Sequence, residues 1–166
     1  AYTVAVNVAK SSSGKNLSDK EAVALFVRYM NEYCRMIGMY HSNFINPDGW
    51  DDTKQYVTAE DMVILAKNVL SQPILREIVG TQSKHVVFKS GESITWENSN
   101  KLLSKKGEYY NKYCIGIKTG TTNSAGNCLV SAYEKNGNTY IIMVFDCPSN
   151  KSRYENTNTL WKKYCK

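Results

Sequence analysis

The stretch Ile115-Gly116-Ile117-Lys118-Thr119-Gly120-Thr121-Thr122 carries a lysine, a threonine and a glycine within a β-branched run. Such a run favours a strand, on which side chains alternate between faces, so Lys118 and Gly120 share one face while Thr119 takes the other. Glycine lacks the side chain that would keep a ligand away from the backbone. We therefore predict that an anionic, peptide-like ligand can lie along this strand edge. Lys-Thr-Gly alone recurs by chance, so the rest of the chain has to support this interpretation.

The composition is that of an ordinary globular protein. The chain has 166 residues, of which 42% are hydrophobic and 22% charged, a size that fits one domain or part of a larger one. No apolar run approaches the roughly 20 residues that a membrane-spanning helix needs. The net charge of +6 would attract a polyanionic cell envelope. The basic residues are scattered and form no arginine-rich or aromatic-basic motif, so no nucleic-acid partner is predicted.

The cysteines give no sign of a metal site. There are five of them, with no Cys-x-x-Cys pair and with His41 and His85 far from them in sequence. Neither a metal nor any other cofactor is therefore predicted. An odd number argues against a complete disulfide framework, so we expect small buried hydrophobic residues. The five are Cys34, Cys114, Cys128, Cys147 and Cys165.

The first sixteen residues give an ambiguous pattern. Val4, Val6 and Val8 alternate, which is typical of a strand, whereas the alanines at positions 1, 5 and 9 leave a helix possible. Residues 10–16 are polar and rich in serine, so we expect a loop there.

Three helices are expected next. Ser18 and Glu21 have the spacing of a capping box, and apolar residues then recur at intervals of three and four up to Gly38. A second cap at Thr58 starts another amphipathic helix, and Pro73 starts a short third one.

The second half of the chain reads as strands followed by a helix. We expect strands at 85–89, 114–121, 127–134 and 139–145. Asn136-Gly137 is a preferred two-residue hairpin turn between the last two, and residues 151–164 have a helical pattern. Helices, then an antiparallel three-strand meander, then a C-terminal helix indicate an α+β fold.

Several blocks of the sequence occur in a fixed order that resembles a known family. They are Phe44-Ile-Asn-Pro-Asp-Gly-Trp-Asp-Asp52, Tyr56-Val-Thr-Ala-Glu-Asp61, Asn98-Ser-Asn100-Lys-Leu-Leu103, Gly116-Ile-Lys-Thr-Gly-Thr-Thr122, Ala125-Gly126, and Pro148-Ser149 with Arg153 and Leu160-Trp161. This order resembles the serine D-alanyl-D-alanine carboxypeptidases, the low-molecular-weight penicillin-binding proteins. The resemblance covers nearly the whole chain and implies part of the β-lactamase/transpeptidase-like fold.

The resemblance also implies a mechanism. In the family a Ser-x-x-Lys, a Ser-x-Asn and a Lys-Thr-Gly motif meet in one cleft, and the substrate is cleaved through a serine ester. Lys118 would set the positive potential over the cleft and help to polarise the serine of the second motif. The backbone N–H of Thr121 would be an oxyanion donor. The expected substrate-binding residues are Thr119, Gly120, Thr122 and Arg153.

Simpler interpretations stand beside these. Without the flanking blocks, Lys118 would be a solvated strand lysine. Arg153 either holds the substrate's C-terminal carboxylate, which suits a guanidinium fork, or is an ordinary surface arginine. We expect the Asn46-Pro47-Asp48-Gly49 loop to be scaffold, and Asn98 and Asn100 to tie loops to the backbone.

The first two family motifs precede the matched blocks, so we expect a C-terminal part of the catalytic domain that lacks the nucleophile and is inactive alone. By the same resemblance, residues 1–9 would be a helix. Ser12-Ser13-Gly14-Lys15 fits Ser-x-x-Lys but lies in the predicted loop, after the place of the second motif, so it is not taken as the nucleophile. The strand at 139–145 would lose a neighbour of the family's five-stranded sheet. We expect the missing N-terminal part or a second copy of the chain to cover it.

We therefore expect residues 1–166 to form a single incomplete transpeptidase-like domain, with a mainly helical part at 1–80 and a sheet part with the C-terminal helix at 81–166. The expected function is D-alanyl-D-alanine carboxypeptidase of peptidoglycan maturation, acting outside the cytoplasmic membrane. Stem peptides ending in D-Ala-D-Ala, and β-lactams once the site is complete, would be its ligands. One alternative is a non-catalytic module that binds peptidoglycan or a partner. Another is a β-lactamase-related hydrolase, which the Asn-Pro-Asp-Gly-Trp and Asn-Ser-Asn blocks disfavour.

Overall fold

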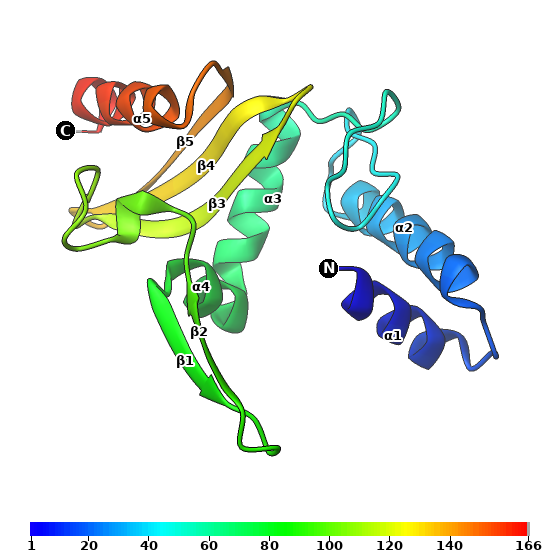
Figure 1. Ribbon diagram of the computed structural model, residues 1–166. Coiled ribbons are helices and arrows are strands. Elements are labelled where there is room, and N and C mark those ends of the chain that lie inside the picture. The colour runs from blue at the N-terminus through cyan, green and yellow to red at the C-terminus, as the bar shows by residue number, and fades with distance from the viewer. Residues whose placement is uncertain (166) are drawn as a thin grey trace. The chain divides into compact units, whose positions relative to one another are not determined.

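The computed structural model describes residues 1–165, and the chain divides into two compact units, 1–65 and a second that begins at Ala66. Figure 1 shows the order of helices and strands. Each unit has its own cluster of buried apolar side chains.

The first unit begins with two helices, α1 (Tyr2–Ser13) and α2 (Asp19–Met36). Val6, Ala9 and Ala22 form the buried contact between them. Since the side chains buried on α1 lie on one helical stripe rather than at alternate positions, the strand pattern seen at the start of the sequence is misleading. The helix that the family resemblance implies is confirmed.

Helix α1 continues four residues into the expected loop. The prediction of a loop over residues 10–16 is therefore wrong for Lys10 to Ser13. The Ser12 and Ser13 hydroxyls donate to carbonyls one turn earlier, on Ala9 and Lys10. Such back-bonding lets serine remain in a last helical turn, and Lys10 Nζ also lies 2.6 Å from an Asp19 carboxylate oxygen.

Helix α2 begins as its capping box predicts. The Ser18 hydroxyl accepts a hydrogen bond from the Glu21 N–H, and the Glu21 carboxylate accepts one from the Ser18 N–H at 2.9 Å. The helix ends at Met36, two residues before Gly38. The predicted helix is confirmed at both ends.

The loop that follows is held by side chains bonded to backbone. Asn31 donates to the Phe44 carbonyl at 2.6 Å and accepts from the Phe44 N–H at 2.9 Å. Within the Asn-Pro-Asp-Gly turn, the Gly49 N–H donates to Asn46 Oδ1 at 2.7 Å. These are the bonds of a scaffold loop. Helix α3 (Ala59–Ser71) then starts at the predicted Thr58 cap, whose hydroxyl accepts from the Asp61 N–H.

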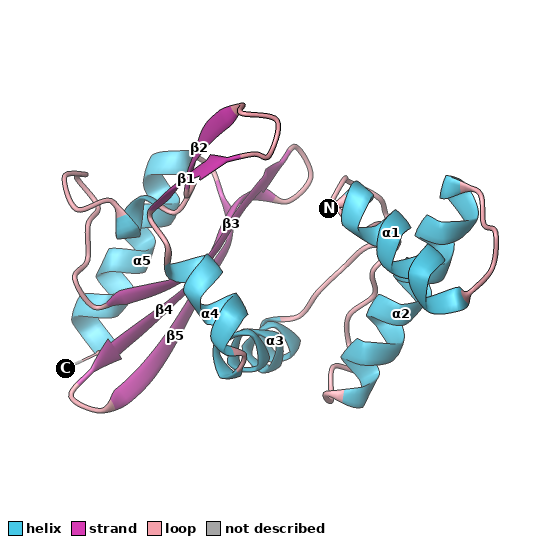
Figure 2. Ribbon diagram, turned by 90° about the horizontal axis from the view of Figure 1, so that it is seen from below, coloured by secondary structure: helices cyan, strands magenta, loops and turns pink. Residues whose placement is uncertain are grey.

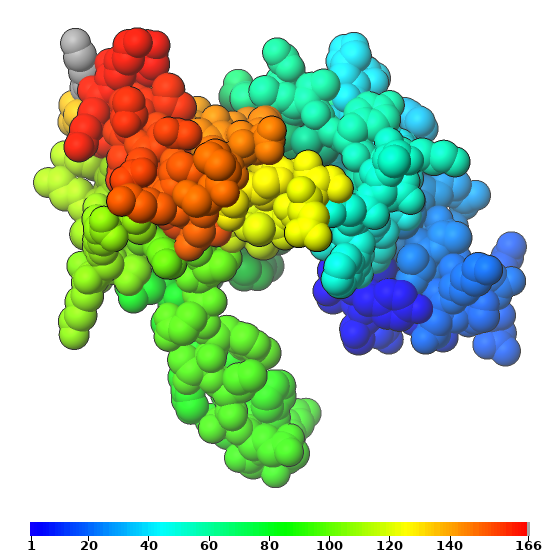
Figure 3. Space-filling view, turned by 45° about the horizontal axis from the view of Figure 1, so that its top comes forward, coloured from blue at the N-terminus to red at the C-terminus, as the bar shows by residue number. Residues whose placement is uncertain are grey.

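The second unit contains two antiparallel sheets, which Figure 2 shows separately. After the short helix α4 (Pro73–Gly80), β1 (Ser83–Val87) pairs with β2 (Ser93–Glu97). Our sequence analysis predicted only the first strand of this hairpin. The hairpin stands out from the rest of its unit, as the green segment of Figure 3 shows.

The larger sheet has the order β3–β4–β5 and is the predicted meander. Its strands are β3 (Cys114–Thr122), β4 (Gly126–Lys135) and β5 (Asn138–Cys147). Asn136 and Gly137, between the last two strands, both have positive φ, 53° and 76°, so the predicted two-residue hairpin turn is of type I′.

Helix α5 (Asn150–Tyr164) packs on β4 and β5, while α4 packs on β3. The Trp161 ring stacks on the buried Tyr133 ring with centroids 4.4 Å apart, and it meets the Tyr140 ring edge-on at 5.9 Å. This aromatic packing joins the last turns of α5 to the sheet and fixes the direction in which its first turn points.

The turn into β4 gives a stability prediction. Gly126 has φ +63°, and a Cβ there would lie 2.7 Å from Asp146 Oδ1 and 3.0 Å from its Cα. Gly137 has φ +76° with nothing among the described residues within 4 Å of such a Cβ. Both alanine substitutions incur the backbone strain of about 1 kcal/mol. We expect Gly126→Ala to cost at least about 1 kcal/mol more, because the backbone at Asp146 must move.

Urea unfolding followed by near-UV circular dichroism, to which the packed Trp161 contributes, measures both variants. Gly137→Ala is the matched control for backbone strain. Equal losses of unfolding free energy in the two variants would contradict the close approach of Gly126 to Asp146.

Candidate active site

Strand β3 presents the Lys-Thr-Gly residues as the alternation predicts. Thr119 is only 7% exposed, whereas Lys118 and Gly120 face outward. Within the described part of the chain, β3 is an edge strand that pairs with β4 alone. One row of its backbone groups is therefore left without a neighbouring strand.

The Lys118 ammonium lies along this strand and donates to the Thr119 carbonyl at 2.6 Å. The Thr119 hydroxyl lies 2.7 Å from the Ser99 hydroxyl. The Asn98-Ser99-Asn100 block is thereby joined to the Lys-Thr-Gly block, which lies twenty residues further along the chain.

The two asparagines of that block tie the loop to the backbone, as we predicted. Asn98 Nδ2 donates to the carbonyls of Val79 and Thr81, at 3.2 and 3.1 Å. The buried Asn100 accepts from the Leu102 N–H at 3.1 Å, which caps a short 3₁₀ turn, Lys101–Leu103. The loop is thus connected both to the end of α4 and to its own continuation.

Arg153 lies beneath the end of β3. The residue is 7% exposed, and its Nη1 donates to the Gly120 carbonyl and to Thr121 Oγ1, each at 3.0 Å. The other terminal nitrogen, Nη2, donates to Asn150 Oδ1. The surface-arginine interpretation is therefore wrong, because this side chain is buried and bonded to the strand that carries the motif.

The two threonines that end β3 have different surroundings. Thr121 Oγ1 lies between Arg153 and Asn127 Oδ1, the latter at 3.3 Å. Thr122 Oγ1 accepts from the Ala125 N–H at 3.0 Å and so closes the turn into β4. Thr122 therefore fixes the course of the strand end, while Thr121 is held by the buried cation.

Tyr154 is a residue next to the candidate site that our sequence analysis did not single out within the predicted helix at 151–164. It is completely buried, and its hydroxyl donates to the Ser99 carbonyl at 3.0 Å and accepts from the Lys101 N–H at 3.1 Å. A single tyrosine near the start of a helix carries no local signal for such a contact. Only its position next to Arg153 could have drawn attention to it.

The cysteines behave mainly as packing residues. Cys34, Cys147 and Cys165 are buried, as predicted, whereas Cys114 and Cys128 are half-buried. Burial raises the pKa of the Cys114 thiol to about 11, and the thiol donates to the Gly116 carbonyl. A protonated thiol is a poor nucleophile, so Cys114 supports the base of β3.

The Ser12-x-x-Lys15 segment, which matches the nucleophile motif in sequence, has the wrong geometry for a nucleophile. Ser12 lies in the last turn of α1, with its hydroxyl 3.3 Å from the Ala9 carbonyl. Gly14, in a left-handed conformation, ends the helix before Lys15. The arrangement that a Ser-x-x-Lys nucleophile needs, with serine and lysine on one turn at the start of a helix, is therefore not present at Ser12 and Lys15.

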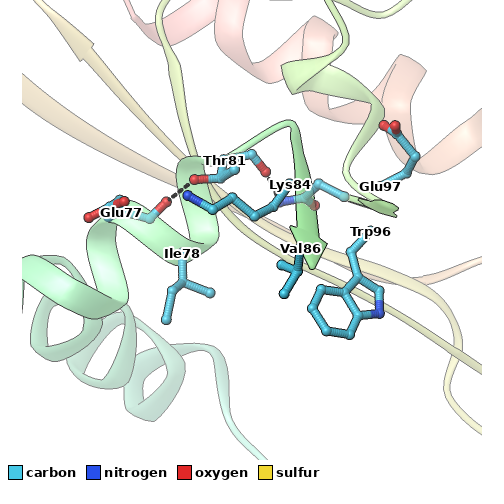
Figure 4. Close-up of a pocket in the computed structure, with 8 residues that line it drawn as sticks. Glu77, Ile78, Thr81, Lys84, Val86, Trp96 and Glu97 are labelled. Atoms are coloured by element: carbon cyan, nitrogen blue, oxygen red, sulfur yellow. Dashed lines mark hydrogen bonds between the residues drawn. The ribbon is translucent and has the colours of Figure 1, made fainter. Parts of the chain in front are cut away.

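A separate cavity of about 320 Å³ lies between α4 and the β1–β2 hairpin. Figure 4 shows Ile78, Val86 and Trp96 on its apolar side, with Lys84 reaching across towards Glu77 and Thr81. None of the three Lys-Thr-Gly residues lines it. The cavity is therefore distinct from the edge of β3.

A sequence model described as D-alanyl-D-alanine carboxypeptidase matches residues 4–149. The chain belongs to the D-alanyl-D-alanine carboxypeptidase family. The family resemblance that the motifs indicated is thus confirmed. The match ends before α5, so Arg153 and Tyr154 are placed at the site by the structure rather than by the family match.

Relatives in the carboxypeptidase family cover most of this chain. It is 33% identical to D-alanyl-D-alanine carboxypeptidase DacA of Haemophilus influenzae over 77% of its own length and 31% of that protein. It is 29% identical to DacF of Bacillus subtilis over 77% of its length and 32% of that protein. The chain thus spans about a third of the length of these curated relatives.

Solved carboxypeptidase-family structures confirm the α+β, transpeptidase-like fold. The Streptomyces K15 DD-transpeptidase matches 97% of this chain and 60% of its own, with 26% identity and a TM-score of 0.84. Penicillin-binding protein D2 of Listeria monocytogenes, solved in a cefotaxime-bound form, matches 84% of this chain and 54% of its own with a TM-score of 0.70. Among residues 1–165, none of the helices combines the length and apolar character needed to cross a membrane.

The raised pKa of Cys114 predicts how stability changes with pH. Between the ordinary value of 9.0 and about 11, the unfolded chain releases the thiol proton while the folded chain keeps it. The stabilisation is therefore complete below pH 9 and is lost as the pH rises towards 11, at about 1.4 kcal/mol per pH unit. Cys114→Ala should remove the part of the alkaline loss of unfolding free energy that this thiol causes.

Urea unfolding of both proteins at pH 8, 9, 10 and 11 measures the difference, because the other alkaline groups are common to both. Parallel curves for the wild type and Cys114→Ala would contradict the burial of this thiol in the folded state.

Proposed function

We propose that residues 1–166 contribute the Lys-Thr-Gly wall to the active site of a D-alanyl-D-alanine carboxypeptidase, as the C-terminal part of its catalytic domain. We further propose that they form a single incomplete domain, mainly helical at 1–80, with the sheet and C-terminal helix at 81–166. The observation that carries the proposal is the edge of β3, which has no neighbouring strand among the described residues and presents an exposed Lys118 beside a buried, hydroxyl-bonded Thr119.

Lys118 would act through its charge. Its ammonium is exposed and bonded to the Thr119 carbonyl, so it lies close to the strand edge. There it would polarise the serine hydroxyl of the second family motif and attract the substrate's carboxylate. Both effects are strongest when the substrate excludes water from the cleft.

The backbone of β3 would bind the peptide and the oxyanion. Consecutive residues direct their N–H and C=O groups to opposite edges of a strand, so the Thr121 N–H lies on the same edge as the Thr119 carbonyl. A Cβ at Gly120 would meet nothing within 4 Å among the described residues, which leaves room for a ligand. One oxyanion donor of this kind contributes about 3 kcal/mol to the transition state.

The hydroxyls and Arg153 would complete substrate binding. Thr119 would donate to a substrate oxygen, while Thr122 keeps the strand end in place through the Ala125 N–H. The Arg153 guanidinium, 3.0 Å from Thr121 Oγ1, would provide the positive charge for the substrate's C-terminal carboxylate. Carboxylate and guanidinium form strong charge-assisted bonds.

The proposed reaction is acyl transfer to a serine that the rest of the protein provides. The serine oxygen attacks the carbonyl of the penultimate D-alanine, the terminal D-alanine leaves with a proton on its amine, and water then hydrolyses the ester. The substrate would be a peptidoglycan stem peptide ending in D-Ala-D-Ala, met outside the cytoplasmic membrane. β-Lactams would acylate the same serine, and the missing part or a second copy would pair with the edge of β5.

The first test uses the product of the whole coding sequence that contains these 166 residues, called here the complete protein. We expect a stoichiometric β-lactam adduct by intact-protein mass and D-alanine release from a D-Ala-D-Ala peptide. Lys118→Ala should lower both rates about 100-fold or more, because it removes a charge that acts on the transition state. Lys106→Ala, at an exposed position outside β3, is the matched control and should leave both rates unchanged.

A complete protein that forms no adduct and releases no D-alanine would instead be a non-catalytic module of the same fold. A Lys118→Ala variant as active as Lys106→Ala would remove Lys118 from the proposed site.

The 166-residue chain by itself should behave differently from the complete protein. We expect no adduct after incubation with a β-lactam, because Ser12 lies at a helix end away from any lysine partner on the same turn. Mass spectrometry of the treated chain measures this. An adduct mapped to Ser12 would overturn the proposal that the nucleophile lies elsewhere.

A further inference from the structure

Tyr154 fixes the loop that faces the Lys-Thr-Gly strand. Its hydroxyl uses both of its hydrogen-bonding roles on that loop, donating to the Ser99 carbonyl and accepting from the Lys101 N–H. Its ring stacks on Tyr109, with centroids 4.8 Å apart and planes 17° from parallel. A completely buried phenol held in this way has little freedom. The backbone on either side of Asn100 is therefore fixed by one side chain.

The Ser99 side chain carries this constraint to the strand. Its backbone is held by Tyr154, while its hydroxyl lies 2.7 Å from Thr119 Oγ1. Each hydroxyl has one proton to donate. When Ser99 donates to Thr119, the Thr119 proton is left for another acceptor, and the rotamer of Thr119 is fixed by the bond it receives.

Two consecutive residues of α5 thus hold two of the three threonines at the end of β3, Thr119 and Thr121. Arg153 bonds Thr121 directly, and Tyr154 reaches Thr119 through Ser99. The two residues hold the strand through different segments, because Arg153 bonds carbonyls of β3 and β4 whereas Tyr154 bonds the loop before β3.

We infer that Tyr154 and Ser99 are positioning residues for the carboxypeptidase reaction: Tyr154 fixes the Ser99 backbone, and the Ser99 hydroxyl orients Thr119 so that its proton points to the substrate. This inference rests on the proposed function. Neither residue touches the reacting atoms. Their removal should therefore slow the reaction without removing the nucleophile or the charge of Lys118.

The kinetic test compares four variants of the complete protein. Tyr154→Phe and Ser99→Ala should each lower the rate of β-lactam acylation and kcat/KM for D-alanine release about tenfold, because each removes hydrogen bonds through which Thr119 is oriented. Ser99→Thr keeps a hydroxyl and should stay within about threefold of the wild type. Tyr164→Phe removes a hydroxyl from the same helix at a position that is 63% exposed, and should change neither rate.

The final amount of adduct separates positioning from folding. A positioning role leaves one β-lactam bound per chain, reached more slowly, whereas a purely structural role lowers the fraction of chains that ever react. Unchanged rates in Tyr154→Phe and Ser99→Ala would overturn the inference. A reduced final adduct with an unchanged rate would also overturn it.

Amide hydrogen exchange, resolved by residue in the same complete proteins, tests the anchor without turnover. Tyr154→Phe should lower the protection of the Lys101 N–H about tenfold, whereas Ser99→Ala and Tyr164→Phe should leave it unchanged. Lost protection with unchanged kinetics overturns only the positioning role. A wild-type protein that forms no adduct overturns the proposed function, and with it this inference.

Discussion

The buried guanidinium of Arg153 is the interaction on which the geometry of the candidate site depends. Arg153 is 7% exposed, and its cation must find acceptors inside the protein, since an uncompensated buried charge costs several kcal/mol. Here the acceptors are the carbonyls of Gly120 and Cys128 and the hydroxyl of Thr121. They are together only while β3 lies beside β4. The charge therefore makes the strand pairing and the position of the α5 first turn depend on each other.

Much of the fold could be predicted because its signals are local. The Ser18 cap and the Asn136-Gly137 turn each depend on residues that are close together in the sequence, and both are confirmed. The start of the chain could not be read in this way, because its valines alternate while packing against α2 selects a helix. The strand that contains Trp96 was missed for a related reason. This strand forms by pairing with β1, where Lys84 lies opposite Trp96. The pairing depends on both segments, so the residues of β2 alone do not predict it.

The residues of the candidate site also divide into those that the sequence predicts and those that it does not. Lys118, Thr119 and Gly120 could be selected from the sequence, because alternation on a strand follows from the backbone alone. The burial of Arg153 and the contacts of Tyr154 could not, since Tyr154 lies 55 residues from the Ser99 carbonyl that it binds. Long-range contacts of this kind depend on how α5 packs on the sheet, and the sequence pattern of α5 indicates only which residues are apolar.

The order of the sheet would allow the proposed domain to be completed without closing the proposed site. β4 lies between β3 and β5, so the two edges that are left unpaired among the described residues are on opposite sides of the sheet. The β5 edge, with the apolar run from Ile141 to Phe145, is the kind that proteins cover with another strand. The β3 edge carries an exposed ammonium and an open glycine, which suit a transient ligand better than a permanent neighbour. A strand added at β5 would therefore extend the core and leave the Lys-Thr-Gly edge free for a peptide.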